Sequence, residues 1–240
     1  IQSLGYFVGG VISLYIAFKK FKIYFLFTKY EEIISSFKKG FSLFALTIGT
    51  NLYTNANVFI LSFFVSNHLL GIYSAAEKVI KGLQSLTSPI TQALFPHIGY
   101  SLKSVNLKEK LNVIRKLSIY SIVLLIVPTL LIVIFSDTIV QIVAGKEFFE
   151  SVYLVKLMSP LILIGTLNFI LGVVGLINLN FQNTFFVAVM ISGIVSVLFV
   201  LLGAKYLGIY AGALSILISE ILLLFICLNK YRLINKQESV

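Results

Sequence analysis

Long uncharged apolar runs alternate with short polar segments along almost the whole chain. A helix that crosses a bilayer needs roughly 20 mainly apolar residues. The two longest runs, Gly40–Ala76 and Leu157–Ala204, must therefore each hold two helices, and turn-forming residues divide them at Ser66–His68 and Asn178–Asn183. The pattern predicts seven membrane helices, at about 1–18, 41–65, 74–101, 117–136, 152–177, 183–203 and 207–229.

Composition agrees with this pattern. Hydrophobic residues make up 58% of the chain and charged residues 12%, whereas a soluble domain has roughly 45–50% apolar and about 25% charged residues. We therefore expect an all-α polytopic membrane helix bundle. The single cysteine, Cys227, excludes an internal disulfide and a cysteine-based zinc site. The chain has no glycine-rich phosphate-binding loop either, so no cofactor and no metal are expected.

The basic residues are concentrated in a few loops, which predicts the orientation of the chain. The segments 19–39, 103–116, 178–183 and 230–240 carry fourteen Lys or Arg residues, and the alternate loops at 66–73, 137–151 and 205 carry two. Cytoplasmic loops carry an excess of Lys and Arg, so the first group and the C-terminus are predicted to be cytoplasmic. The net charge of +10 is explained by these loops, and nucleic acid is not expected as a partner.

The segment 19–40 mixes lysines with aromatic residues. Such a basic amphipathic segment can lie along the headgroups, with its lysines toward anionic membrane lipids. It could also be a plain cytoplasmic connector between two lobes of a carrier, and the two interpretations are compatible.

Two predicted helices carry polar stripes that would be costly in lipid. At helical spacing, one face of the second predicted helix collects Thr47, Asn51, Thr54, Asn55 and Ser62, and one face of the third collects Glu77, Lys81, Ser85, Ser88 and Gln92. Polar stripes on two adjacent helices favour a water-filled substrate cavity. The alternative is that these groups only form hydrogen bonds across packed helices.

Two carboxylates inside the predicted membrane helices could couple transport to an ion. Glu77 also fits a capping box with Ser74 as the N-cap, which is at least as good an explanation of its place. Glu220 is the one charged residue of the last predicted helix, and a structural role with a bonded partner explains it equally well.

Three sequence blocks lie in order along the first half of the chain: Leu52–Asn57 (LYTNAN), Gly71–Lys78 (GIYSAAEK) and Ser88–Pro96 (SPITQALFP). Together with a weaker block at Tyr206–Ala213 (YLGIYAGA), they resemble bacterial polysaccharide-export flippases. These are the Wzx-type O-antigen or lipid-linked oligosaccharide translocases of the multidrug/oligosaccharidyl-lipid/polysaccharide exporter superfamily.

The resemblance implies a carrier with two related lobes around a central cavity, rather than an enzyme. The chain would then comprise the last helix of the N-terminal lobe (1–18), a connector (19–40), a six-helix C-terminal lobe (41–229) and a cytoplasmic tail (230–240). The implied substrate is an oligosaccharide repeat linked to undecaprenyl diphosphate, carried across the bacterial cytoplasmic membrane. A polysaccharide polymerase and a chain-length regulator are the implied protein partners.

Two other functions remain open. A cation-coupled drug exporter of the same superfamily would need an apolar, aromatic-lined pocket with carboxylates, whereas the polar stripes offer amides, hydroxyls and a lysine. A membrane-bound polysaccharide polymerase or transferase would need clustered ionisable residues on a sizeable loop. The longest loops here are short and mostly basic, which counts against that enzyme.

Overall fold

The computed structural model describes residues 2–21, 30–101 and 106–238 of the 240-residue chain, and its regular structure there is helical throughout. The chain divides into two compact units, Ile1–Phe41 and Ser42–Val240. The first unit contains α1 (Gln2–Phe21) and the start of α2 (Tyr30–Leu61). The rest of α2 opens the second unit, followed by α3 (Asn67–Ser101), α4 (Leu107–Ile134), α5 (Ser136–Val143), η1 (Lys146–Ser151), α6 (Val152–Met158), α7 (Pro160–Asn168), η2 (Phe169–Ile177), α8 (Gln182–Leu207) and α9 (Ile209–Glu238).

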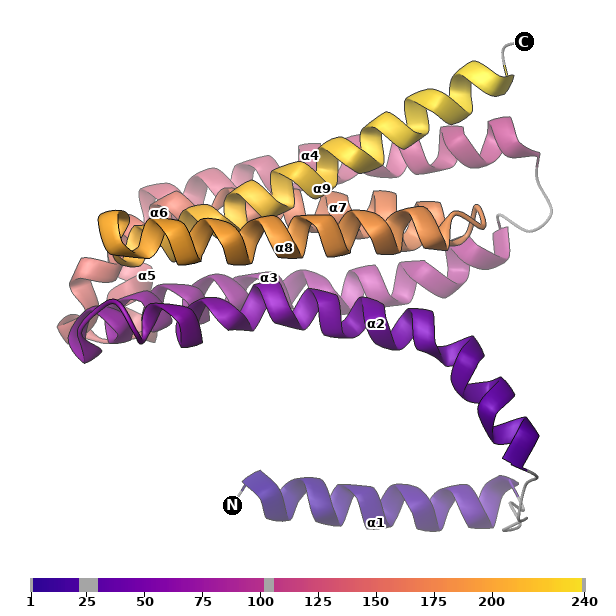
Figure 1. Ribbon diagram of the computed structural model, residues 1–240, viewed down its shortest axis with the longest axis horizontal. Coiled ribbons are helices and arrows are strands. Elements are labelled where there is room, and N and C mark those ends of the chain that lie inside the picture. Colours follow the sequence, from indigo (N-terminus) through magenta and orange to yellow (C-terminus); the bar gives the residue numbers. More distant parts are fainter. Residues whose placement is uncertain (1, 22–29, 102–105, 239–240) are drawn as a thin grey trace. The chain divides into compact units, whose positions relative to one another are not determined.

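The second unit is a bundle whose turns alternate between its two ends (Figure 1). The α2–α3 turn, α5 and the α8–α9 turn lie at one end. The start of α4, the turn before α8 and the end of α9 lie at the other. Helices α8 and α9 form the most extensive helix pair, and α7 packs on both α4 and α9. This up-and-down order agrees with the predicted alternation of loops between two sides.

The bundle has two hydrophobic cores, one near each end. The first joins the end of α2 and the start of α3 to α6, α7 and the α8–α9 turn, with Leu61, Tyr73, Leu154 and Ala211 fully buried. The second joins α4 and η2 to the start of α8 and the end of α9, and Cys227 is fully buried there. Because α8 and α9 contribute to both cores, this helix pair connects the two ends of the bundle.

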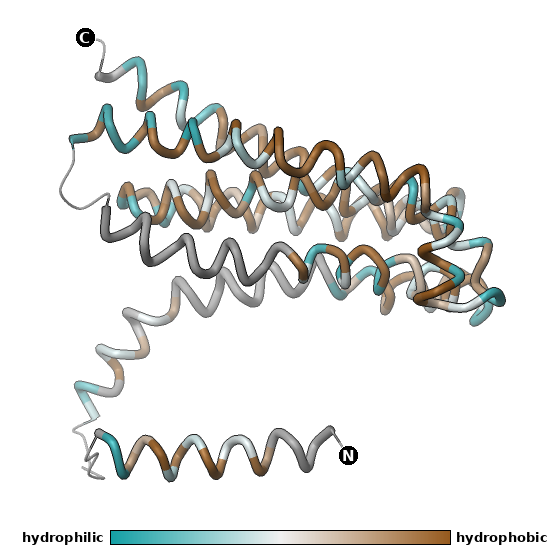
Figure 2. Tube along the Cα trace, turned by 180° about the vertical axis from the view of Figure 1, so that it is seen from behind, coloured by the Kyte–Doolittle hydropathy of each residue, from teal (hydrophilic) through white to brown (hydrophobic). Residues whose placement is uncertain are grey.

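The helices of the bundle consist largely of apolar residues, as the brown stretches in Figure 2 show, and many of these residues are exposed. Large side chains such as Leu124, Leu202 and Phe225 are 63–74% exposed. A water-soluble protein rarely exposes large contiguous apolar surfaces, whereas a bilayer solvates them. The all-α membrane fold predicted from the sequence is therefore confirmed.

Four described segments are long and apolar enough to cross a membrane: Leu107–Ile134, Pro160–Ile177, Gln182–Leu207 and Ile209–Lys236. They match four of the seven predicted spans. The crossing of the membrane by α1, α2 and α3 stays a prediction.

Several predicted helix ends were wrong, because the helices continue into polar segments. Helix α2 starts at Tyr30, inside the predicted connector, and α4 starts at Leu107, inside the predicted basic loop. The side chain of Asn106 caps α4 by accepting a hydrogen bond of 2.9 Å from the amide of Glu109. The outer loop predicted at 137–151 contains α5 and the short helix η1.

The start of α3 was placed seven residues too late. The helix begins at Asn67, where Ser66 acts as the N-cap: its hydroxyl accepts a hydrogen bond from the amide of Leu69 and its carbonyl accepts one from the amide of Leu70. Ser74 lies about two turns further on, inside the helix. The predicted capping box of Ser74 and Glu77 is therefore wrong, and Glu77 is not occupied by a helix end.

The fifth predicted span is divided into α6, α7 and η2. Pro160 lies at the start of α7, where its missing amide hydrogen does not interrupt an established helical ladder. The last part, Phe169–Ile177, is a π-helix, and the turn that follows has Asn180 in the left-handed conformation with a φ of 64°. The turn predicted at 178–183 is confirmed.

Gly212 of α9 lies close to side chains of both α2 and α3. A Cβ atom at this position would lie 2.7 Å from Leu61 Cδ1 and 2.8 Å from the ring of Tyr73. These distances are shorter than a van der Waals contact, so any larger residue must displace side chains of the first core. The contact explains the small residue in the block Tyr206–Ala213.

We expect Gly212→Ala to destabilise the protein by about 1–3 kcal/mol, the usual cost of overpacking a close-packed core. Gly203→Ala is the matched control, because its Cβ would lie 3.5 Å from Ala211 Cβ, an ordinary contact. Thermal unfolding in detergent should show a lower midpoint for the first variant alone. Equal midpoints for the two variants would contradict the close approach at Gly212.

Candidate functional site

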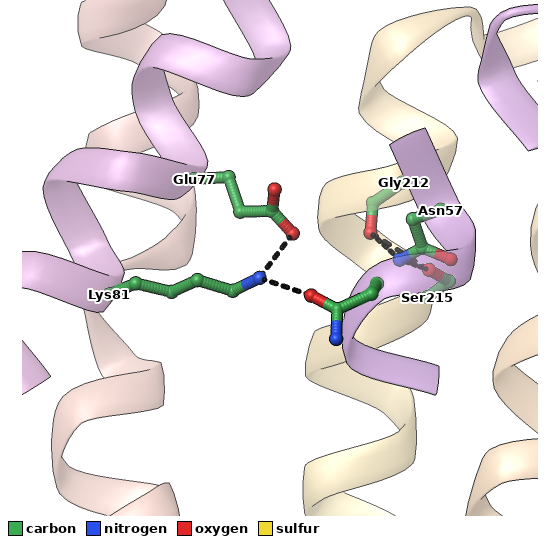
Figure 3. Close-up of polar contacts among 6 residues, drawn as sticks. Asn57, Glu77, Lys81, Gly212 and Ser215 are labelled. Carbon is green, nitrogen blue, oxygen red and sulfur yellow. Dashed lines mark hydrogen bonds and ion pairs between the residues drawn. The ribbon is translucent and has the colours of Figure 1, made fainter. Parts of the chain in front are cut away.

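A polar cluster connects α2 and α3 in the second unit. The ammonium of Lys81 forms an ion pair of 3.2 Å with Glu77 Oε1, one turn earlier on α3. It also donates a hydrogen bond of 3.1 Å to Asn55 Oδ1 of α2. Figure 3 shows Lys81 extending from α3 toward α2, with the carboxylate of Glu77 above it. The structure thus brings together three residues that periodicity had assigned to two separate stripes.

The two charges of this cluster differ in exposure. The side chain of Glu77 is 9% exposed and that of Lys81 is 43% exposed. The carboxylate therefore belongs to the packed interior, and the ammonium lies at its open edge. A buried carboxylate needs a cation close by, and Lys81 supplies it while keeping part of its surface accessible.

Lys81 also lies deeper along α3 than the sequence suggested. With the helix starting at Asn67, Lys81 is about 21 Å along its axis at ~1.5 Å per residue. It is therefore in the middle part of a 35-residue helix rather than close to one end. An ion pair at such a place is costly, and charged residues within membrane helices usually mark a functional path.

Asn57, two residues after Asn55, faces the opposite way and has a different role. It is fully buried, and its amide donates hydrogen bonds of 3.1 Å to the carbonyl of Gly212 and 2.8 Å to Ser215 Oγ (Figure 3). These bonds hold α2 against α9. Asn57 was not among the predicted site residues, because its position opposite Gly212 and Ser215 depends on how α2 packs against α9.

Of the other predicted substrate-cavity residues, the structure describes only Ser85. Ser85 is exposed, and its hydroxyl donates a hydrogen bond to the carbonyl of Gly82 in its own helix rather than to α2. Gln84, beside the stripe, donates to the carbonyl of Leu161 on α7. The remaining predicted side chains fall outside the described residues: Thr47, Asn51, Thr54, Ser88 and Gln92.

Glu220 has a bonded partner on a neighbouring helix. The amide of Asn168, at the end of α7, donates hydrogen bonds of 2.6 Å to Glu220 Oε2 and 2.9 Å to the Glu220 carbonyl. Asn168 is buried and the π-helix η2 begins at the next residue. Of the two roles considered for Glu220, these bonds favour the structural one, in which it fixes α9 at the junction of α7 and η2.

No metal site is formed by the part of the chain that the structure describes, where no three His, Cys, Asp or Glu side chains are grouped. The described residues also line pockets. One of about 470 Å³ lies among α4, α7, η2 and α9, and one of about 350 Å³ lies among α3, α5 and η1 and includes Lys78.

Comparison with known proteins agrees with these features. Residues 1–102 match the model of a family described as "Polysaccharide biosynthesis protein". Two relatives carry the name "Putative O-antigen transporter": one from Shigella dysenteriae, 27% identical over 95% of this chain, and one from Escherichia coli strain K12, 25% identical over 96%. The predicted resemblance to polysaccharide-export proteins is therefore confirmed. No solved structure matches the chain.

The chain spans only 57% and 56% of the lengths of these two relatives. Both relatives are named as transporters, and neither name describes an enzyme. The division into lobes at 1–18, 19–40, 41–229 and 230–240 is not tested by these matches and stays a prediction.

If Glu220 has a structural role, loss of its partner Asn168 should lower the stability of the protein more than loss of the Glu220 charge does. We expect Asn168→Leu to destabilise the protein by about 1–3 kcal/mol, because it removes both hydrogen bonds that Asn168 donates to Glu220. We expect Glu220→Gln to be close to wild type, because the amide oxygen can still accept the bond from Asn168. The midpoint of thermal unfolding in detergent measures both effects. A Glu220→Gln variant of normal stability that fails to transport would restore the ion-coupling role.

Proposed function

We propose that this chain is the C-terminal part of a flippase for oligosaccharide repeats linked to undecaprenyl diphosphate. The observation that carries the proposal is the half-exposed ammonium of Lys81, held between Glu77 and Asn55 in the middle of α3. The similarity to proteins named as O-antigen transporters supports the substrate class.

The cluster suits an anionic head group that must bind and then leave. A lysine ammonium is a compact point charge with three donors. When no substrate is bound, Glu77 neutralises it and Asn55 accepts one of its bonds. A diphosphate oxygen can take the place of Asn55 Oδ1 as acceptor, and the bond then becomes charge-assisted and stronger. Because Glu77 keeps its ion pair throughout, the carboxylate is never left buried without a cation.

The two polar stripes extend this site along the helices. In the proposal the sugars contact the amides and hydroxyls of Thr47, Asn51, Thr54, Ser85, Ser88 and Gln92, which line a wet path. The polyprenyl tail stays in the surrounding lipid, since it needs no polar partner. Glu77 is the remaining candidate for ion coupling, because its charge state would determine how firmly Lys81 is held.

We further propose that the protein lies in the cytoplasmic membrane with the C-terminus of this chain inside. The fourteen-to-two division of basic residues between the loops supports this orientation. The polymerase and the chain-length regulator would then act on the outer face, on repeats that this carrier delivers.

The function is tested in a strain that lacks the full-length protein. We expect that strain to lose surface polysaccharide and to accumulate undecaprenyl-linked repeats. Complementation with Lys81→Ala should reduce export per molecule of protein at least tenfold, the effect of losing about 1.4 kcal/mol of charge-assisted binding. Lys81→Arg should retain part of the export, because it keeps the charge.

Lys78→Ala is the matched control, because Lys78 is an exposed lysine on the same helix, outside the bond from Lys81 to Asn55. Its export should remain close to wild type. Full export by Lys81→Ala at normal abundance would remove Lys81 from the site, and normal surface polysaccharide in the deletion strain would contradict the proposed substrate class.

Orientation is tested by cysteine labelling in the full-length protein with Cys227 replaced. A cysteine introduced at Asn106, the cap of α4, should react with an impermeant maleimide only after the cells are opened. A cysteine at exposed Asn67 should react in intact cells, because it lies at the other end of the bundle. Labelling of position 106 in intact cells would invert the proposed orientation.

A further inference from the structure

A groove of about 470 Å³ separates α4 from α9. Its floor is formed by Leu167 of α7 and Leu171 of η2, and its walls by residues of the two longer helices. Both α4 and α9 pack on α7 and η2, but within the described residues they make no extensive contact with each other. The volume lies in the range of small-molecule sites, roughly 300–1,000 Å³.

The groove is polar at one end and apolar at the other. On α4, Asn112 and Arg115 come first along the chain, and Ile119 and Ile122 follow within two turns. On α9 the order is reversed, with Leu224 before Asn235. Since α4 begins and α9 ends at the same end of the bundle (Figure 1), the amides of Asn112 and Asn235 and the guanidinium of Arg115 gather at that end, and the hydroxyl of Ser118, further along, donates a hydrogen bond to the carbonyl of Ile114 in its own helix. Arg115 and Ile122 are about 10 Å apart along α4 at ~1.5 Å per residue.

The floor of the groove is apolar even where it carries a tyrosine. The hydroxyl of Tyr231 donates a hydrogen bond of 2.8 Å to the carbonyl of Leu171 in the π-helix. This bond occupies both polar groups, so Tyr231 presents its ring to the groove. The apolar part therefore offers no partner to a polar ligand and suits a hydrocarbon chain.

The polar end of the groove is strongly basic. Arg115 lines it, and within the described residues no acidic side chain forms an ion pair with Arg115. The same end of the bundle carries six more cations, on the start of α4 and the end of α9: Lys108, Lys110, Lys116, Lys230, Arg232 and Lys236. A guanidinium in such surroundings favours a phosphate, which it can bind with two parallel hydrogen bonds.

We propose that this groove binds one anionic glycerophospholipid, with an acyl chain along Ile119, Ile122 and Leu224 and the phosphate at Arg115. Basic pockets between membrane helices at the cytoplasmic surface are suited to anionic head groups. None of the groove's lining residues comes from α2 or α3, which carry the candidate transport site. The lipid held here is therefore a resident of the protein and not the transported molecule.

The test uses the full-length protein, purified in mild detergent and titrated with lipid under native mass spectrometry. The probes are phosphatidylglycerol and phosphatidylcholine with identical acyl chains. We expect phosphatidylglycerol to bind the wild type about tenfold more tightly, and Arg115→Gln to remove that preference, since a charged hydrogen-bonded pair contributes ~1.5–3 kcal/mol. Arg232→Gln, which removes the same charge outside the groove lining, is the matched control and should keep the preference.

A second pair of variants tests the apolar part. Ile119→Trp should fill the groove and lower the binding of both lipids at least tenfold, whereas Leu130→Trp, on an exposed part of α4 outside the groove, should lower neither. Thermal unfolding checks that both variants are folded. If Ile119→Trp fails to fold, the two arginine variants still test the proposal. Arg115 and Arg232 are exposed, so their substitution should leave the fold intact.

Three results would overturn the proposal. The first is equal binding of the two phospholipids by the wild type. The second is an equal loss from Arg232→Gln and Arg115→Gln, which would mean that the charge of the whole surface attracts lipid without a site. The third is displacement of phosphatidylglycerol by undecaprenyl phosphate in an Arg115-dependent manner, which would assign the groove to the tail of the carried substrate.

Discussion

The fold depends on one constraint: inside a bilayer, every backbone amide and carbonyl must find its partner within the protein. Most do so along unbroken helices, and the exceptions are satisfied one by one. Pro160 lies at a helix start, where no donor is needed. The π-helix changes the spacing of the backbone hydrogen bonds. There the hydroxyl of Tyr231 donates a hydrogen bond to the carbonyl of Leu171, and the side-chain amide of Asn178 donates one of 2.7 Å to the carbonyl of Val174. Side chains thus complete the backbone where the helix is irregular.

Apolar runs alone predict most of this architecture, since a long run without charge has only one stable form in lipid. The turn between α2 and α3 and the turn at 178–183 follow for the same reason, because they are the places where polar groups can meet water, although the first lies a few residues earlier than the predicted 66–68. Helix ends were less predictable. Helices α2, α3 and α4 start in polar sequence, where nothing in the hydrophobic pattern changes and the start depends on caps such as Ser66 and Asn106. The π-helix has no signature in the apolar run that forms it.

Periodicity placed Glu77 and Lys81 on one face of a helix, and the structure agrees. It could not pair Lys81 with Asn55, because the relative height of two helices depends on their packing and not on the sequence of either. Here that height follows from the contact of α2 and α3 with Gly212 and from the bonds of Asn57 to α9. The polar residues of α2 therefore divide by face: Asn57 holds the helix in place, and Asn55 is left to exchange partners. Breaking the bond from Lys81 to Asn55 leaves α2 anchored.

The turn between α8 and α9 is a single residue, Gly208, with a φ of 55°. An L-residue with a side chain rarely adopts this conformation. With so short a connection, neither helix can cross the bilayer far ahead of the other, so the two must enter it together as a hairpin. Their packing against each other can then form before the rest of the bundle is complete.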